Sequence, residues 1–527
     1  MQGLLPSEHE NLSLPSSSRS CSRPDTPGLL TSRSGSSHPS SAGSDSTPAL
    51  SRGDWTCRDE PVDDLIPAYS AADVVRRLRK MYKPYFKNHE NPHDEMWGPE
   101  ADPTVELEFP NDNATERYIL LAPKDKDHYN PIMCLESSLY TIVQFYLTEK
   151  QRSFFGPIPT AILCDADTPP DSPPTPDDEP FTKSRSRSLK SKPNEPDEGY
   201  RLLIEKLKEA KRSPPKLNYL RTLQRAINTF DGPLFLHTLG VINSYLRFLK
   251  YPPLPSGVLQ TKLSTNYLKK AVRGFPSDAL PKDLLMRVLE ENYQRSVGPN
   301  VPALRKYEAF SSKVYGELMP SLAYDIIADA GLTEDSVFVD LGSGVANVVV
   351  QASLQTGCYS FGVEIMKTAA EVGEASVKNF EKRCRMWGLN VGKMETEHND
   401  MMQSSRLDEL IPKADLLLVD NKVFKESLNE ALRPKFLDLK EGAIVVSLAP
   451  FVSNGGGRVT ERNLDDISAI LDVTEKQYHS GSVSWGNGGG TYYVHRIDRA
   501  GYAKNREQYE RLRDSSTPTT RATRSRR

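Results

Sequence analysis

The segment VFVDLGSGVANVVV, residues 337–350, constrains the fold of this chain more than any other stretch. Its first half is an apolar, β-branched run that ends in an acid, which is typical of a buried parallel strand. Gly342 and Gly344 follow, and residues without a Cβ let the backbone turn sharply and approach a ligand. The second apolar run predicts a helix whose free N–H groups and positive dipole end face the loop. The segment therefore predicts a strand, a ligand-binding loop and a helix in succession.

Strand and helix patterns alternate around this segment, from about residue 301 to residue 500. Further strands are expected at CYSFGVEI, near residues 394–398, at DLLLV and at GAIVVSL, with a long helix at 367–387. The stretches 477–485 and 491–497 flank a glycine-rich turn and predict an antiparallel hairpin at the sheet edge. Strands that alternate with helices over short connections indicate a parallel, doubly wound α/β sheet.

Composition separates the remaining chain into ordered and disordered stretches. The N-terminal region is rich in Ser, Pro, Gly and Thr and buries too little apolar surface to offset the entropy of ordering. A short helix at 73–82 is expected at the edge of this tail, and order is expected to begin near Trp97. The expected organisation is a largely disordered tail at 1–95, the start of an N-terminal lobe at 96–150, a disordered Pro-rich insertion at 151–198, a helical lobe at 199–300, the ligand-binding domain at 301–500 and a basic tail at 501–527.

The formal net charge of -3 conceals local blocks of opposite sign. Residues 165–179 hold six acids and no base, whereas KSRSRSLKSK at 183–192 holds five bases and no acid. Residues 504–527 hold eight bases and three acids. Such runs are usually solvated and disordered, and contact with nucleic acid or a nuclear import factor is the alternative.

The six cysteines are widely spaced and form no C-x-x-C pair, so neither a disulfide framework nor a zinc site is expected. No apolar run approaches the length that spans a membrane, and the polar N-terminus lacks the apolar core of a signal peptide. These features favour a reducing intracellular compartment.

Acids and an amide fall where the predicted strands end, which is the edge at which such sheets bind ligands. Asp340 directly precedes the glycine loop, where its carboxylate would repel a pyrophosphate and attract a cationic α-amino group. Glu364 suits two ribose hydroxyls, Asp400 suits an adenine amino group, and Asp420-Asn421 follow the fourth strand. This set favours S-adenosylmethionine over a nicotinamide dinucleotide. An acid that caps a helix in an empty nucleotide-like fold remains the alternative.

Several spaced motifs make the chain resemble the fungal-like members of the disruptor-of-telomeric-silencing methyltransferases, which modify lysine-79 of histone H3 and lack the SET fold. The resemblance runs from about Trp97 to Arg499 and omits the Pro-rich insertion. The motifs are Tyr315-Gly316-Glu317, DLGSG with Asn347, Gly362-Val363-Glu364, Asn421 with Phe424, and Val483-Ser484-Trp485 with Tyr492-Tyr493.

The resemblance implies a seven-stranded, doubly wound class I S-adenosylmethionine methyltransferase sheet with an N-terminal mainly helical lobe and long disordered tails. It implies a nuclear, nucleosome-dependent lysine methyltransferase that acts in chromatin regulation and silencing and needs no metal. Basic segments would add salt-dependent affinity for nucleosomal DNA. The candidates are Lys183, Arg185, Arg187, Lys190, Lys192 and the C-terminal tail.

The resemblance also assigns roles to individual residues. The Tyr315 loop would close over the methionine part of the cofactor, and Phe310, Trp485 and Tyr492 would line a narrow channel for the lysine. The cofactor-binding set is Tyr315, Gly316, Glu317, Leu318, Asp340, Gly342, Ser343, Gly344, Asn347, Glu364, Asp400 and Met401. The catalytic set is Asp420, Asn421, Tyr492, Trp485 and Phe310.

Three residues depart from the family pattern. Ala346 replaces the third glycine of the loop, and Gly486 stands where the family usually has Thr. Asp420 replaces the first of two asparagines beside the transferred methyl group, where a carboxylate would attract the sulfonium but hold the lysine protonated. The alternatives are a methyltransferase of RNA or a small molecule, and a catalytically weak chromatin-binding module.

Overall fold

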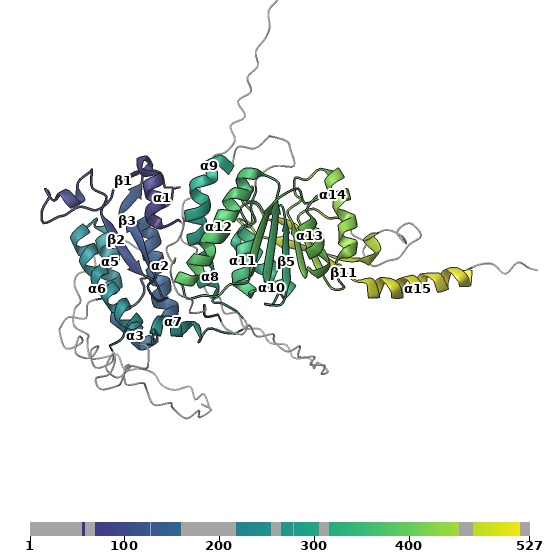
Figure 1. Ribbon diagram of the computed structural model, residues 1–527, viewed down its shortest axis with the longest axis horizontal. Helices are drawn as coiled ribbons and strands as arrows, with labels where there is room; N and C mark the ends of the chain where they lie inside the picture. The colour runs from purple at the N-terminus through teal and green to yellow at the C-terminus, as the bar shows by residue number, and fades with distance from the viewer. Residues whose placement is uncertain are drawn as a thin grey trace, which may run out of the picture.

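The computed structural model describes residues 55–57, 69–126, 128–159, 218–253, 265–277, 279–304, 316–452 and 467–516. Its centre is a seven-stranded sheet in the order β10-β11-β9-β8-β5-β6-β7 (Figure 1). Strands β5 to β9 run parallel, whereas β11 is antiparallel to both β9 and β10. The expected seven-stranded sheet is confirmed. Its strands are β5 (Val337–Leu341), β6 (Tyr359–Glu364), β7 (Met394–His398), β8 (Leu416–Val419), β9 (Ile444–Ser447), β10 (Leu471–Tyr478) and β11 (Gly490–Ile497).

The chain winds outward from β5 in two directions, through β6 to β7 and then through β8 to β9. The connections after β5 and after β8 therefore leave the sheet on opposite faces, and a crevice forms where they part. Asp340 on β5, Glu364 on β6 and Asp420 after β8 all lie at this carboxyl edge. The sheet order thus brings together the strand-end acids that the sequence singled out.

Helices cover both faces of the sheet. Phe338 packs with α10 (Pro320–Ala330), α11 (Asn347–Thr356) and α12 (Lys367–Met386) in the larger apolar core. The next residue along β5, Val339, packs on the other face with α13 (Ser405–Leu410) and α14 (Glu426–Leu432). Because successive side chains of a strand point to opposite faces, one short apolar run supplies both cores.

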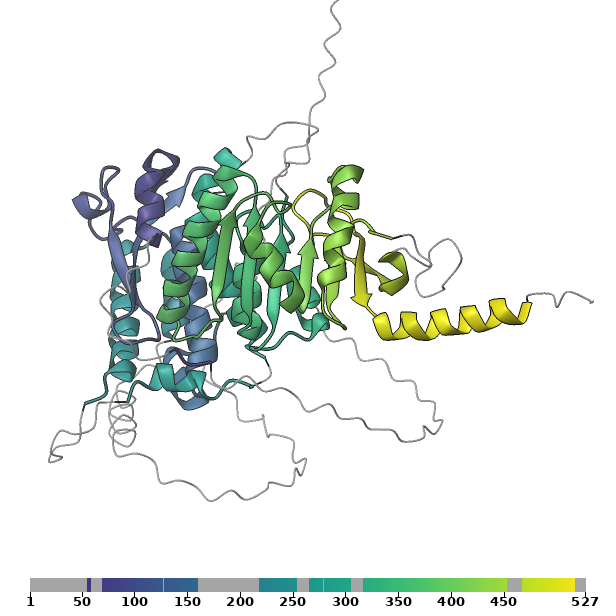
Figure 2. The ribbon, with the colours of Figure 1, turned by 45° about the vertical axis from the view of Figure 1, so that its right-hand side comes forward.

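An N-terminal lobe packs against the α12 side of the sheet through α8, as Figures 1 and 2 show. The lobe is mainly helical, as the resemblance implied. The lobe consists of α1 (Ala71–Arg77), β1 (Tyr82–Pro84), β2 (Thr104–Glu108), β3 (Thr115–Ile119), β4 (Leu121–Pro123), α2 (Pro131–Tyr146), α3 (Glu149–Phe155), α5 (Tyr219–Asn228), α6 (Gly232–Lys250), α7 (Tyr267–Val272) and α8 (Lys282–Asn292).

Folded structure begins well before Trp97, so the expectation of disorder up to residue 95 is wrong for residues 69–95. Ser70 and Asp73 form a reciprocal capping box at the start of α1, which satisfies two backbone N–H groups. The helix buries four of its own apolar residues, and β1 pairs with β4. A few well-placed apolar residues order this stretch despite its polar average. The insertion expected at 151–198 begins within a helix that runs to Phe155, so its expected disorder is wrong for residues 151–155. Residues 160–217, which include the basic block, lie outside the described residues.

The antiparallel edge pair is present, but its first strand is β10 at Leu471–Tyr478 and not 477–485. Val483 and its neighbours lie in the loop between β10 and β11, because they pair with another segment. Met319 N donates to Ser482 O at 2.9 Å, and Leu318 forms an antiparallel bridge with Val483. The paired segments are more than 160 residues apart in the sequence, so the local sequence pattern could not predict this pairing.

The C-terminal region begins as a helix, α15 (Arg499–Ser516), which projects from the body of the molecule (Figure 2). The expected basic tail is therefore helical from its start to residue 516. Arg506 pairs with Glu510, and Glu507 pairs with Arg511, at the four-residue spacing that supports an exposed helix. No helix within the described residues is both long and apolar enough to cross a membrane.

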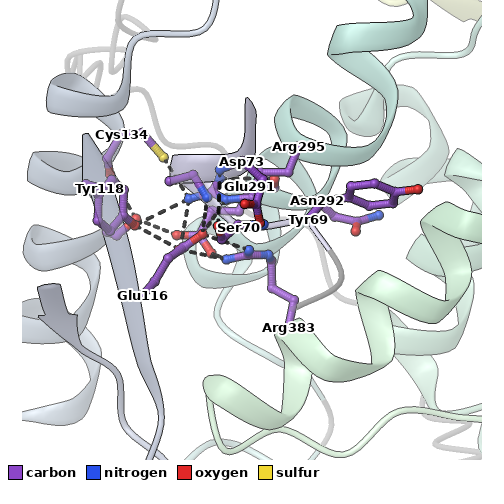
Figure 3. Close-up of polar contacts among 12 residues, drawn as sticks. Tyr69, Ser70, Asp73, Glu116, Tyr118, Cys134, Glu291, Asn292, Arg295 and Arg383 are labelled. Atoms are coloured by element: carbon purple, nitrogen blue, oxygen red, sulfur yellow. Dashed lines mark hydrogen bonds and ion pairs between the residues drawn. The ribbon is translucent and has the colours of Figure 1, made fainter. Parts of the chain in front are cut away.

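A buried ionic network joins the lobe to the sheet (Figure 3). Glu116 of β3 accepts from Arg295 at 2.7 Å and from Arg383 of α12 at 3.1 Å. Arg383 also pairs with Glu291 of α8 at 2.8 Å, and all four side chains are fully buried. Burial acts to raise the pKa of Glu116, but the two arginines outweigh it and hold that pKa well below its usual range.

Candidate functional site

The glycine loop after β5 is tied to the end of β6. Gly342 N and Ser343 N both donate to Val363 O, at 2.9 and 3.0 Å, and Gly344 N donates to Glu364 Oε2 at 2.8 Å. Gly342 has a φ of 86°, a conformation that a residue with a Cβ rarely adopts. No side chain caps the start of α11, so its first N–H groups remain available at the loop. The predicted strand, loop and helix are confirmed.

Ala346 ends the loop in the left-handed region, with a φ of 64°. The family's glycine would adopt this conformation without strain, whereas alanine pays about 1 kcal/mol. The replacement therefore carries a backbone cost.

Three carboxyl groups crowd together where β5, β6 and β8 end. Burial, followed by repulsion from Asp420 and Glu364, raises the pKa of Asp340 well above its usual range. Burial raises the pKa of Asp420 to about 7, although the Lys422 N–H and its charge oppose the shift. Burial also raises the pKa of Glu364, against the backbone N–H groups of Met366 and Gly344.

Within the described part of the chain, no cationic side chain lies within ion-pair distance of Asp340, which is only 5% exposed. A buried carboxyl group in such surroundings gains strongly from a cationic ligand. An α-ammonium and a sulfonium, the two cationic groups of S-adenosylmethionine, suit this group of carboxylates. Among the described residues, no group of three or more His, Cys, Asp or Glu side chains is arranged to hold a metal ion.

The segment after Tyr315 pairs with the loop between β10 and β11. Glu317 N donates to Ser484 Oγ at 2.8 Å, and Ser484 N donates to Glu317 O at 2.9 Å. The Trp485 ring packs against Gly316 so closely that a Cβ built there would lie 2.6 Å from a ring carbon. The structure thus brings together two motifs that lie far apart in the sequence.

The Glu317 side chain turns from this pairing toward the glycine loop. Asn347 Nδ2 donates to Glu317 Oε2 at 3.0 Å, and the Tyr293 hydroxyl donates to Oε1 at 3.1 Å. Leu318 points instead into the core and is buried. Glu317 and Asn347 therefore form one contact, where the sequence had suggested two separate polar contacts to the cofactor.

The expected adenine side is built from a turn after β7. Asp400 Oδ1 accepts from Met402 N at 2.9 Å and so caps this turn. Met401 and Phe424 flank the loop, because a Cβ at Gly342 would lie 3.9 and 3.8 Å from their terminal carbons. Phe424 belongs to a motif of the sequence but received no role from it. The two side chains offer an apolar surface beside a polar turn, which suits a purine ring.

Asn421 and Tyr492, two residues of the expected catalytic set, lie in environments that differ from each other. The Asn421 amide is buried: its Oδ1 accepts from Leu448 N and Ala449 N at 3.0 and 2.7 Å, and its Nδ2 donates to Ala449 O at 3.0 Å. This amide fastens the end of β9 to β8. Tyr492 lies on β11, three strands from β5, in a hollow shared with Lys476 and Asp329. Phe310 and Tyr315 lie outside the described residues.

Sequence reasoning missed the groups that complete the site from other elements. Tyr293 comes from the end of the lobe, and a hollow beside Glu364 is lined from the start of α12. That lining includes Glu371, Gly373, Glu374 and His398. Apart from His398, which ends β7, none of these residues sits at a strand end or in a glycine motif, so a pattern of local spacing could not have identified them.

Comparison with known proteins places the similarity in this same region. Residues 293–497 match the family model described as Histone methylation protein DOT1. The histone-lysine N-methyltransferase, H3 lysine-79 specific, of Emericella nidulans is 30% identical over 431 residues, which cover 81% of this chain and 69% of that protein. The protein of the same name from Mycosarcoma maydis is 31% identical over 528 residues, with 82% and 62% covered. The chain spans between half and about two thirds of the length of such relatives.

Solved structures with a related fold include an RNA methyltransferase from Salinibacter ruber in complex with S-adenosyl-L-homocysteine. It has a TM-score of 0.23 and 22% identity, and the match covers 34% of this chain and 94% of that one. An O-methyltransferase from Bacillus cereus has a TM-score of 0.26 and 13% identity, with 40% and 90% covered. The assignment of the fold rests on the sheet order given above.

Proposed function

This chain belongs to the DOT1 family of histone methylation proteins, and from that membership we propose that it is an S-adenosylmethionine-dependent methyltransferase of histone H3 lysine-79 in nucleosomes. The observation that carries the proposal is the buried Asp340 carboxyl group beside the glycine loop, which has no ion-pair partner among the described residues. It provides a cation-binding position at the place where the family's motifs put the cofactor.

Each strand end contributes one part of cofactor binding. Asp340 holds the α-ammonium group, and Glu364 accepts the ribose hydroxyls while it keeps the loop in place through Gly344 N. Met401 and Asp400 receive the adenine, and Glu317 closes over the methionine end. Gly342, Ser343, Leu318 and Asn347 shape the backbone and hold these groups. Asn421 acts as a positioning residue, since its amide is engaged with β9.

When bound, S-adenosylmethionine supplies an electrophilic methyl group that a neutral lysine amine can attack in line. The C–S bond breaks with its electron pair on sulfur, a C–N bond forms, and the amine proton passes to water. The protein mainly positions and desolvates the amine. Trp485, which is 41% exposed beside Gly316, forms a wall of the lysine channel.

Asp420 stands close to the transferred group, and its raised pKa bears on its role. With a pKa of about 7, the side chain is largely neutral at pH 6 and largely charged at pH 8. The neutral form resembles the family's asparagine in shape and does not hold the lysine ammonium. Asp420 therefore makes transfer depend on pH in a way that an asparagine would not.

Nucleosomes carry dense negative charge, so basic segments outside the described residues add affinity. The segment 183–192 and the end of the chain serve this role, and the protein acts in the nucleus. Deletion of either segment is expected to weaken nucleosome binding more at low salt than at high salt. Equal losses at all salt concentrations would contradict this role.

The test uses tritiated S-adenosylmethionine with intact nucleosomes, free histones and RNA in parallel. Label on nucleosomal H3 that is lost when its lysine-79 is replaced is the expected result. Label on RNA and none on nucleosomes would overturn the proposal. Binding of the cofactor without any transfer would instead assign the protein as a chromatin-binding module.

A matched pair of variants ties the activity to the glycine loop. Gly344→Arg fills the loop and is expected to abolish cofactor binding. Gly488→Arg places the same side chain in a glycine-rich turn where a Cβ meets no atom within 4 Å, and should bind normally. Equal cofactor affinity of both variants, measured by calorimetry, would place the cofactor elsewhere.

A further inference from the structure

A π-helical turn at Tyr293–Val297 follows α8 and lies between the lobe and the cofactor region. Such turns are rare in proteins and occur often at functional sites, because the extra residue re-aims the side chains around it. Here the turn directs neighbouring residues to opposite sides. Arg295 points into the buried ionic network, and Tyr293 points toward the Glu317 carboxylate.

One side of the turn is clamped by buried polar contacts, as Figure 3 shows for Arg295. Arg295 reaches Glu116 of β3 at 2.7 Å. Asn292 donates to Ser376 at 2.9 Å and accepts from Asn379 at 2.9 Å, and both partners lie on α12. Because these groups are buried, any shift of the turn leaves polar atoms unsatisfied. The turn is therefore fixed relative to both the lobe and α12.

The other side of the turn faces the cofactor loop. The Tyr293 ring packs against a small apolar cluster that includes Val345 of the glycine loop and Ala369 of α12. Its hydroxyl lies 3.1 Å from Glu317 Oε1, and Asn347 Nδ2 holds the other oxygen at 3.0 Å. These two donors are neutral and bind one oxygen each, so they orient the plane of the carboxylate without neutralising its charge.

We propose that Tyr293 is a positioning residue for cofactor binding, whose hydroxyl holds Glu317 in the orientation that closes over the methionine end of S-adenosylmethionine. This inference rests on the proposed function and adds a residue from outside the glycine and strand-end motifs. The lobe thus takes part in cofactor recognition through one hydroxyl group on a clamped turn. Loss of that hydroxyl removes one of the hydrogen bonds that orient the Glu317 carboxylate.

The test compares Tyr293→Phe with the unchanged full-length protein by calorimetry. Affinity for S-adenosylhomocysteine is expected to fall about tenfold, in line with the loss of a hydrogen bond to a charged group. Affinity for 5′-methylthioadenosine, which lacks the amino-acid end, is expected to stay within about twofold. In the Glu317→Ala background, Tyr293→Phe should cause little further loss, because Glu317→Ala already removes the acceptor of the Tyr293 hydroxyl.

Tyr140→Phe provides the matched control. The Tyr140 hydroxyl donates to Glu136 at 2.7 Å within α2, so this variant loses a tyrosine-glutamate hydrogen bond away from the cofactor region. It should alter thermal stability about as much as Tyr293→Phe and leave both affinities unchanged. A purely structural role for Tyr293 would make the two variants alike.

Three results would overturn the inference: unchanged affinity for S-adenosylhomocysteine in Tyr293→Phe, an equal loss for methylthioadenosine, or a full additional loss in the Glu317→Ala background. Failure of the unchanged protein to bind S-adenosylhomocysteine is a different outcome. It would refute the proposed function itself, and the two failures are therefore distinguishable.

Discussion

Two groups of buried carboxylates in this molecule have opposite surroundings. At the junction of lobe and sheet, Glu116 faces two arginines, which hold its pKa below the usual range despite burial. At the carboxyl edge of the sheet, Asp340 and Asp420 face each other, and burial raises the pKa of both. In the first group, the chain itself supplies the positive charges that balance the carboxylate. The second group favours a cationic ligand.

The two groups also make opposite contributions to the pH dependence of stability. The lowered pKa of Glu116 contributes stability above its ordinary value of 4.5, and this is lost only as pH falls well below that value. The raised pKa of Asp420 makes the folded state bind more protons than the unfolded chain between about pH 4 and 7. Its contribution is therefore greatest in acid and is lost as pH rises through that window. Charge at the junction supports the fold, whereas charge at the site opposes it.

The largest expected effect comes from Glu116→Gln, which removes the counter-charge of the buried Arg295 and leaves Arg383 paired with Glu291 alone. Removal of one partner from a buried ion pair lowers the free energy of unfolding by about 3–5 kcal/mol. Urea denaturation at pH 7.5 measures it. Glu106→Gln is the control, since Glu106 pairs with Arg117 on the surface and its loss costs less than about 1 kcal/mol. Equal effects of the two variants would show that the buried ion pairs contribute no more to stability than the surface pair.

Unlike Glu116→Gln, Asp340→Asn is expected to lower the affinity for the cofactor and not the stability of the fold. At pH 8 the amide removes a buried carboxyl group with two acidic neighbours, so thermal stability should stay equal or rise. Affinity for S-adenosylmethionine should fall about 10–100-fold, the range for a lost hydrogen bond to a charged group. Thermal scans and calorimetry on one sample test both statements. A destabilised variant with normal affinity would place Asp340 among the structural carboxylates.

Gly316→Ala tests whether close packing at the site matters more for activity than for stability. The added Cβ meets the Trp485 ring at 2.6 Å and must displace it, which is expected to lower kcat/KM for nucleosomes about 10–100-fold. Affinity for S-adenosylhomocysteine should change much less. Gly486→Ala, next to Trp485, adds a Cβ with no atom within 4 Å and should retain activity. Similar activity of the two variants would exclude Trp485 from the lysine channel.

The smallest effect is a pH dependence assigned to Asp420. As pH rises from 6 to 8 this side chain becomes charged, so the preference for S-adenosylmethionine over S-adenosylhomocysteine should grow about tenfold. The two ligands differ by the positive charge on sulfur, which isolates this effect from Asp340. Asp420→Asn should flatten the profile. A preference that changes with pH in the variant as it does in the unchanged protein would refute the assignment.

The fold class and the strand-end acids could be read from the sequence because both depend on local pattern. The run before Asp340 supplies alternate side chains to two cores, and the glycines after it allow one backbone path. The expected start of order near Trp97 failed for the same reason, since average composition hides the capping box at Ser70. The limits of the edge strand β10 also escaped prediction, because the Val483 segment pairs with Leu318 and not with the sheet.

The sequence by itself determined the strand, the loop and the acids beside it, since each is fixed by residues within a few positions of one another. Only the tertiary structure decided what surrounds each acid. Glu116 and Asp340 both end up buried, and the sequence around them does not reveal which one meets an arginine. That outcome depends on contacts between residues more than 150 positions apart, which form only when the lobe packs on α12. The same packing places Tyr293 beside Glu317 and connects the lobe to the cofactor site.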